Sequence, residues 1–136
     1  MQDLSATEYW SKGPLALLSY CGEKYPETGK AAMVGYQRWV SSNADYVRRL
    51  DAVQKYFVPI VAKRMNKSTD DYDLRLTKMT NEGVIQQLEQ GLDEGQRHAR
   101  CGDFPGLLDA MFATDLVKPR VTIAIENLER LKRAVR

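Results

Sequence analysis

Apolar residues in this chain recur mostly at the three- and four-residue steps of an α-helix. The first such set follows Gly13 and consists of Leu15, Leu18, Cys21 and Tyr25. Pro14 is predicted to be the first residue of this helix, because proline is favoured at the first helical position, and Pro26 is predicted to end it. Cys21 is therefore expected on an inward face.

The middle of the chain continues the helical pattern. Thr28 is a candidate cap for a second helix. The inward side of this helix is predicted to consist of Ala32, Tyr36, Trp39, Val40 and Asn43. A third apolar series runs from Tyr46 to Val61, and Pro59 near its end predicts a kink or a stop. This series is either one bent helix or two.

Polar start signals and prolines divide the second half of the chain into further helices. Residues 68–71, Ser-Thr-Asp-Asp, suit a helix N-terminus, because acidic side chains interact favourably with the positive end of the helix dipole. The apolar pattern beyond them contains Leu76, Met79, Val84, Leu88 and Leu92, and residues 81–83 are a candidate interruption. Another helix is predicted to begin at Asp103 with Pro105, and the last one after Pro119.

These segments predict an all-α fold. The only candidate β-strand is the short run from Val121 to Ile125, and no alternating series is bounded by hairpin turns. A chain of 136 residues suits one domain and is too short for two independent cores. We therefore expect a single helical domain over residues 1–136, a bundle of five to six helices.

Charge and hydropathy exclude two classes of protein. Hydrophobic residues make up 43% of the chain and charged residues 28%, which is ordinary for a folded globular protein. The net charge of +2 is far below the basic excess of a nucleic-acid-binding protein, and the basic residues after Val117 have no aromatic residues among them. No apolar run approaches the roughly 18 to 20 residues that cross a bilayer. Neither nucleic-acid binding nor a membrane span is expected.

The two cysteines have similar surroundings: YCGEKYP at residues 20–26 and RCGDFP at residues 100–105. The similarity does not extend into the flanking sequence. We interpret it as a helix end at the first site and a helix start at the second, and not as a duplication. Four roles are open for the pair: a disulfide, a metal site, a reactive thiol, or two free buried thiols.

The metal site and the reactive thiol have little support. Zinc needs three or four ligands, and His98 is the single histidine of the chain. His98 and Cys101 are three residues apart, which suits a Cys–His nucleophile on one helix face, but no oxyanion loop or third orienting group accompanies them. An exposed or capping histidine is the simpler interpretation. No metal and no other cofactor is predicted.

We favour a disulfide between Cys21 and Cys101. The bond requires an oxidising compartment and a fold that brings the two Cα atoms within about 7 Å. Each cysteine precedes a glycine, where the backbone adjusts easily. Closing a loop of about 80 residues would stabilise the fold by roughly 4 to 5 kcal/mol. The disulfide in turn predicts a periplasmic or extracellular location.

The N-terminus, MQDLSATEYW, lacks the basic start and apolar stretch of a signal peptide. It suits a mature periplasmic chain from which a signal peptide has been removed and to which Met1 was added. A cytoplasmic start is the alternative. The expected periplasmic location therefore depends on the cysteines.

Asp70, Asp71, Tyr72 and Asp73 form the candidate partner-binding site. The Asp-x-Asp-x-Asp-Gly order and the distant glutamate of a calcium loop are absent. Helix capping accounts for most of these acids. An exposed acidic turn with a tyrosine also suits recognition, because tyrosine gives contact area at low entropic cost and carboxylates pair with basic groups.

The chain contains no catalytic triad, phosphate loop, dinucleotide motif or metal motif, which favours a non-enzymatic binding protein. Its size, its helical content and its Cys21 and Cys101 pair resemble the all-helical periplasmic immunity proteins that bacteria keep against type VI secreted peptidoglycan amidases. This resemblance implies a homodimer or similar assembly that occludes the cleft of a Cys–His amidase and so inhibits it. The turn at residues 70–73 is the candidate inserting element.

Two other functions stay open. A helical carrier would hold a small hydrophobic ligand in a pocket lined by the tryptophans and tyrosines. A thiol enzyme would use Cys101 with His98. A small molecule that co-purifies with the protein favours the carrier, and a tight complex with a protein toxin favours the inhibitor.

Overall fold

The computed structural model of the chain describes residues 2–114 and 117–135. These residues form seven α-helices and one short 3-10 helix, with no strand among them. The elements are α1 (Gln2–Lys24), η1 (Pro26–Thr28), α2 (Gly29–Ser42), α3 (Ala44–Arg64), α4 (Thr69–Gly91), α5 (Glu94–Gly102), α6 (Phe104–Phe112) and α7 (Lys118–Ala134). The predicted all-α class is confirmed, and the predicted number of five to six helices is too low.

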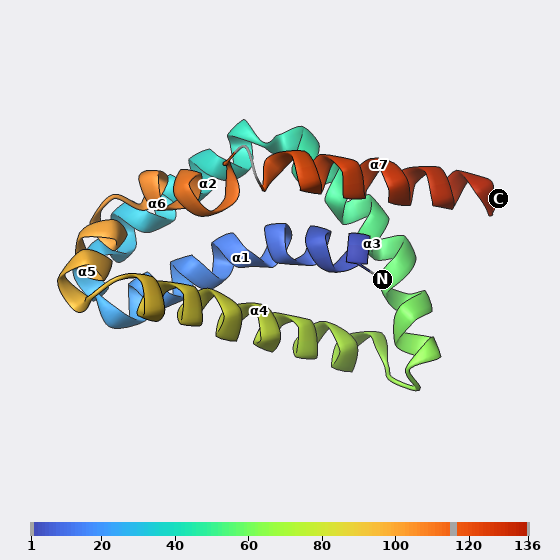
Figure 1. Cartoon of the computed structure of the whole chain (residues 1–136), viewed down its shortest axis with the longest axis horizontal. Coiled ribbons are helices and arrows are strands. Elements are labelled where there is room, and N and C mark those ends of the chain that lie inside the picture. The colour runs from blue at the N-terminus through green and yellow to red at the C-terminus, as the bar shows by residue number, and fades with distance from the viewer. Residues whose placement is uncertain (1, 115–116, 136) are drawn as a thin grey trace.

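α1 is the central helix of the bundle. α4 and α7 lie along it on opposite sides, and α3 packs against all three at the end where the two termini lie (Figure 1). α2 and α6 pack on each other and on α1, and α5 lies at the far end of the bundle (Figure 1). Because helices cover α1 on several sides, it has buried residues along its length.

Two prolines that were predicted to begin or break helices lie inside them. Pro14 is buried in the middle of α1, which already begins at Gln2. Pro59 lies inside α3, so the apolar series from Tyr46 to Val61 is a single helix. Proline removes one backbone hydrogen bond from a helix interior. Buried contacts on both sides of each proline outweigh that loss.

Two further predictions about secondary structure are wrong. The candidate strand from Val121 to Ile125 lies in α7, where the buried residues are spaced with the helical period: Val121, Ala124, Ile125 and Leu128. Residues 81–83 do not interrupt α4, which is continuous to Gly91. In both segments the buried residues follow the helical period, and their packing against other helices stabilises a continuous helix.

The two Cys-Gly pairs both lie at helix ends. Cys21 is one turn before the end of α1, and Cys101 with Gly102 ends α5. The prediction that the second pair begins a helix is therefore wrong. The helix that follows is started by Asp103, whose carboxylate accepts a hydrogen bond from the backbone N–H of Gly106. This cap separates α5 from α6 and accounts for part of the higher helix count.

Trp10 and Phe112 lie at the centre of the core. The indole N–H of Trp10 donates to the carbonyl oxygen of Phe112 over 3.0 Å, so its polar group is satisfied although the residue is buried. Gly13 faces the Phe112 ring, and a Cβ atom at that position would lie 2.4 Å from the ring carbons. The close approach of α1 to α6 therefore requires glycine at residue 13.

Candidate functional site

The disulfide joins the end of α1 to α5. The sulfur atoms of Cys21 and Cys101 lie at bonding distance, 2.09 Å, and the Cα atoms are 5.4 Å apart. Both cysteines are buried in the main hydrophobic cluster. The structure thus brings the two residues together as the sequence predicted. The bridge closes a loop that contains α2, α3 and α4.

His98 does not pair with Cys101. The Nε2 atom of His98 contacts the carboxylate of Glu27, and its ring stacks on Tyr25 with 4.4 Å between the ring centroids. A backbone hydrogen bond, together with this contact, lowers the pKa of the Glu27 carboxyl. The histidine is exposed and Cys101 is held in the disulfide. This arrangement does not provide the thiol and base of a Cys–His nucleophile.

The described residues contain no group of three or more histidine, cysteine, aspartate or glutamate side chains placed to hold a metal ion. Across residues 2–114 and 117–135, no helix is both long and apolar enough to span a membrane.

The acidic turn forms the start of α4. Ser68 is its N-cap, and the Ser68 hydroxyl accepts a hydrogen bond of 3.1 Å from the backbone N–H of Asp71. Asp70 and Asp71 occupy the first turn of the helix, and both are exposed. Within the part of the chain that the structure describes, neither carboxylate forms an ion pair. These two carboxylates are therefore open to a partner.

Tyr72 and Asp73 have contacts inside the protein. Tyr72 is half-buried and packs against the second hydrophobic cluster, which consists of Leu4, Val53, Phe57, Val58 and Leu128. The carboxylate of Asp73 accepts a hydrogen bond of 2.8 Å from the ammonium group of Lys12 on α1. The four predicted residues thus divide into two that are free to contact a partner and two that hold the turn against α1 and α3.

Glu8 lies beside this ion pair and was not singled out by the sequence. Only 3% of the residue is exposed, and its Oε2 atom lies 3.7 Å from Lys12 Nζ with no hydrogen-bond partner among the described residues. Burial raises the pKa of the Glu8 carboxyl, and Lys12 opposes this shift. The signal in the sequence is the i, i+4 spacing of Glu8 and Lys12 on one helix.

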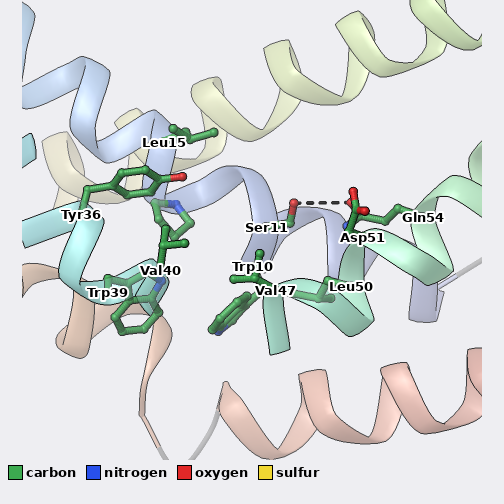
Figure 2. Close-up of a pocket in the computed structure, with 11 residues that line it drawn as sticks. Trp10, Ser11, Leu15, Tyr36, Trp39, Val40, Val47, Leu50, Asp51 and Gln54 are labelled. Carbon is green, nitrogen blue, oxygen red and sulfur yellow. Dashed lines mark hydrogen bonds between the residues drawn. The ribbon is translucent and has the colours of Figure 1, made fainter. Parts of the chain in front are cut away.

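An aromatic pocket opens between α1, α2 and α3 (Figure 2). Its volume is about 210 Å³. It is lined by Trp10, Ser11, Pro14, Leu15, Tyr36, Trp39, Val40, Val47, Leu50, Asp51 and Gln54. The ring centroids of Trp10 and Trp39 are 5.5 Å apart at an angle of 37°. The helical pattern predicts Trp39 on an inward face and gives no prediction for Trp10, which is the more deeply buried of the two.

The α3 side of the aromatic pocket is polar. The Ser11 hydroxyl donates to Gln54 Oε1 over 3.5 Å, and Gln54 Nε2 is buried without a hydrogen-bond partner in the described chain. Asp51 is the one charged residue in the lining. Its carboxylate also pairs with Lys55 at 3.0 Å, and the two side chains are 60% and 77% exposed. The pocket thus combines aromatic side chains with one carboxylate, that of Asp51.

A second depression lies between α1, α4, α6 and α7. It consists of two neighbouring pockets of about 640 Å³ and 490 Å³, which share Gln87, Met111 and Val117 in their linings. The hydroxyl of Tyr9 donates to Gln87 Oε1 over 2.7 Å at this site, and burial raises the pKa of Tyr9. Arg120 lines one pocket and Arg100 the other.

Comparison with known proteins gives no relative to which this chain can be assigned. No protein-family model matches it, and neither a curated protein nor a solved structure gives a significant match. The side chains described above therefore carry the functional inference.

Proposed function

We propose that the protein is a non-enzymatic, periplasmic inhibitor that occludes the active-site cleft of a peptidoglycan amidase with the start of α4. The observation that carries this proposal is the exposure of Asp70 and Asp71, which have no ion pair among the described residues. Two adjacent carboxylates at a helix N-terminus suit a positively charged group, such as the imidazolium of a Cys–His amidase.

The residues next to these acids favour rigid presentation. Tyr72 packs against the second hydrophobic cluster, and Asp73 is tied to Lys12, so the turn loses little conformational freedom on binding. Leu74 is 70% exposed on the following turn and supplies an apolar contact beside the charges.

The disulfide supports the proposed compartment. A bridge such as Cys21–Cys101 persists in an oxidising environment such as the periplasm and is rare in the cytosol. The homodimer implied by the resemblance is part of the same proposal. Light scattering coupled to size-exclusion chromatography tests the homodimer. A monomer at micromolar concentration would contradict the dimer but not the proposed role of the start of α4.

The experiment that tests the proposal has two steps. The protein is first used to capture partners from the periplasmic and secreted fractions of its source, and the affinity of the captured amidase is measured. Replacing both acids, Asp70→Asn with Asp71→Asn, is then expected to weaken binding by well over tenfold. The control variant, Glu82→Gln with Asp109→Asn, changes the net charge equally at two other exposed positions and should bind like the wild type. Equal weakening by the two variants, or none by the first, contradicts the proposal.

A second candidate is a carrier of a small hydrophobic ligand. It is favoured by the depression between α1, α4, α6 and α7, whose larger pocket falls within the usual 300 to 1,000 Å³ of ligand sites. Native mass spectrometry of freshly purified protein distinguishes the two functions. A stoichiometric small molecule bound to the chain supports the carrier, and its absence together with a captured amidase supports the inhibitor.

A further inference from the structure

Both tryptophans of the chain line the aromatic pocket between α1, α2 and α3. Trp10 of α1 is buried, and Trp39 and Tyr36 of α2 are half-buried on the α2 side of the pocket (Figure 2). Aromatic faces attract cations, and arginine stacks on them more often than lysine does. The walls of the pocket therefore favour a flat cationic group over a purely aliphatic one.

The size of the aromatic pocket suits a single side chain. Its volume of about 210 Å³ is below the usual 300 to 1,000 Å³ of sites for drug-sized ligands. Pockets of this kind receive the anchor residue of a partner protein, and arginine is among the residues most enriched as anchors. Leu15, which is exposed beside the aromatic rings, provides an apolar surface for the aliphatic stem of such a side chain.

The polar side of the pocket offers a carboxylate. Gln54 Oε1 accepts a hydrogen bond from the Ser11 hydroxyl, and the Gln54 nitrogen is buried. Asp51 is therefore the charged acceptor that the lining presents to a ligand. A carboxylate matches a guanidinium group, which has several N–H donors in one plane and no acceptor.

Lys55 is the competing cation for Asp51. The two residues form an i, i+4 pair on α3 with both side chains largely exposed. Exposed pairs of this kind contribute little to stability, so a ligand that also contacts the aromatic rings displaces the lysine at little cost.

We propose that the aromatic pocket is a binding site for an arginine side chain presented by a partner protein. The guanidinium stacks on the aromatic wall and pairs with Asp51, and the aliphatic stem lies along Leu15. This site is separate from Asp70 and Asp71, and the inference does not depend on the function proposed above.

The test uses the full chain and three small probes: N-acetyl-arginine amide, N-acetyl-lysine amide and N-acetyl-leucine amide at equal ionic strength. The chain has two tryptophans, so an NMR spectrum has two indole N–H signals, and both report on this pocket. The arginine probe is expected to shift these signals saturably, and to bind about fivefold more tightly than the leucine probe. The lysine probe is expected to be intermediate.

Two conservative variants on α3 should change the affinity of the arginine probe in opposite directions. Asp51→Asn is expected to weaken it about fivefold, and Lys55→Gln to strengthen it about twofold, because the competing cation is removed. Their controls, Asp45→Asn and Lys63→Gln, make the same charge changes at exposed positions of the same helix and should leave the affinity unchanged. None of these changes should alter the affinity of the leucine probe.

Three results would overturn the inference. One is a leucine or lysine probe that binds as tightly as the arginine probe. Another is Asp51 and Lys55 variants that behave like their controls. The third is no movement of the indole signals at the highest soluble probe concentration. A variant with Asp70→Asn and Asp71→Asn should still bind the arginine probe normally, which keeps the failure of one proposal separate from the failure of the other.

Discussion

The ammonium group of Lys12 on α1 lies 2.8 Å from the carboxylate of Asp73 on α4. The same ammonium group is 3.7 Å from the buried carboxylate of Glu8. Lys12 is thus the positive charge between two negative ones, at a contact that fixes the start of α4 against the central helix. Removing it would leave Glu8 as a buried charge without a partner.

Replacing Lys12 by methionine is therefore expected to destabilise the protein by about 2 to 3 kcal/mol. This is somewhat less than the 3 to 5 kcal/mol typical of breaking a fully buried pair, because Lys12 is partly exposed. Urea unfolding measures the change. Adding Glu8→Gln should recover part of the loss, since the buried charge is then absent. The control, Lys55→Met, removes an exposed pair and should cost no more than about 0.5 kcal/mol; equal losses at residues 12 and 55 would contradict the burial argument.

Glu8 also predicts a specific dependence of stability on pH. Burial raises the pKa of this carboxyl in the folded state, where it faces Lys12, Asp73 and Tyr72. At pH values between the pKa of Glu8 in the unfolded state and its pKa in the folded state, the folded protein binds more protons than the unfolded one. The contribution of Glu8 to stability is therefore greatest at low pH and is lost as pH rises through the folded pKa.

The Glu8→Gln variant has a neutral amide in place of the carboxyl and does not titrate at this position. Its free energy of unfolding relative to the wild type should therefore increase as pH is raised from about 4 to about 7. The opposite sign is expected for Glu129→Gln, and below about pH 5, because a hydrogen bond from Arg49 lowers the pKa of Glu129 and its stabilisation is lost as pH falls through the folded pKa. A difference between Glu8→Gln and wild type that does not vary over this pH range would show that the carboxyl titrates normally.

The helices could be predicted because the apolar period is a local signal in the sequence. The disulfide could be predicted because the chain has only two cysteines. The apolar period identifies each helical segment, and a chain with two cysteines offers one intramolecular bridge. Pro14 misled the prediction because its local preference for a helix start is outweighed by the buried contacts of the residues before it, such as Trp10. The start of α1 is thus decided by tertiary packing.

The candidate sites could be predicted only in part. Asp70 and Asp71 are exposed as expected of a polar helix start. The roles of Tyr72 and Asp73 depend on how α4 lies against α1, since Lys12 is 61 residues away in sequence. The aromatic pocket likewise combines residues of three helices, and no spacing along the chain brings Trp10, Trp39 and Asp51 together. Long-range packing of this kind leaves no periodic signal.

The disulfide predicts a measurable loss of stability on reduction. Replacing Cys21 and Cys101 by serine is expected to cost roughly 4 to 5 kcal/mol, because the bridge closes a loop with a sequence separation of 80 residues. Urea unfolding of the wild type with and without a reductant should show the same difference. Intact mass under non-reducing conditions checks that the bridge forms, since the chain should weigh two hydrogens less than its reduced form. A fully reduced mass would exclude the bridge and would remove its support for a periplasmic location.

Two glycines of α1 should respond to alanine in opposite ways. A Cβ atom at residue 13 would lie 2.4 Å from carbons of the rigid Phe112 ring, whereas one at residue 22 meets no atom within 4 Å. Gly13→Ala is therefore expected to destabilise the protein by about 1 to 3 kcal/mol through overpacking. Gly22→Ala should instead stabilise it by about 0.5 to 1 kcal/mol, since alanine loses less backbone entropy in a helix. Urea unfolding of both variants measures the contrast. A stable Gly13→Ala protein would mean that α1 does not pack against α6 as closely as Phe112 and Gly13 indicate.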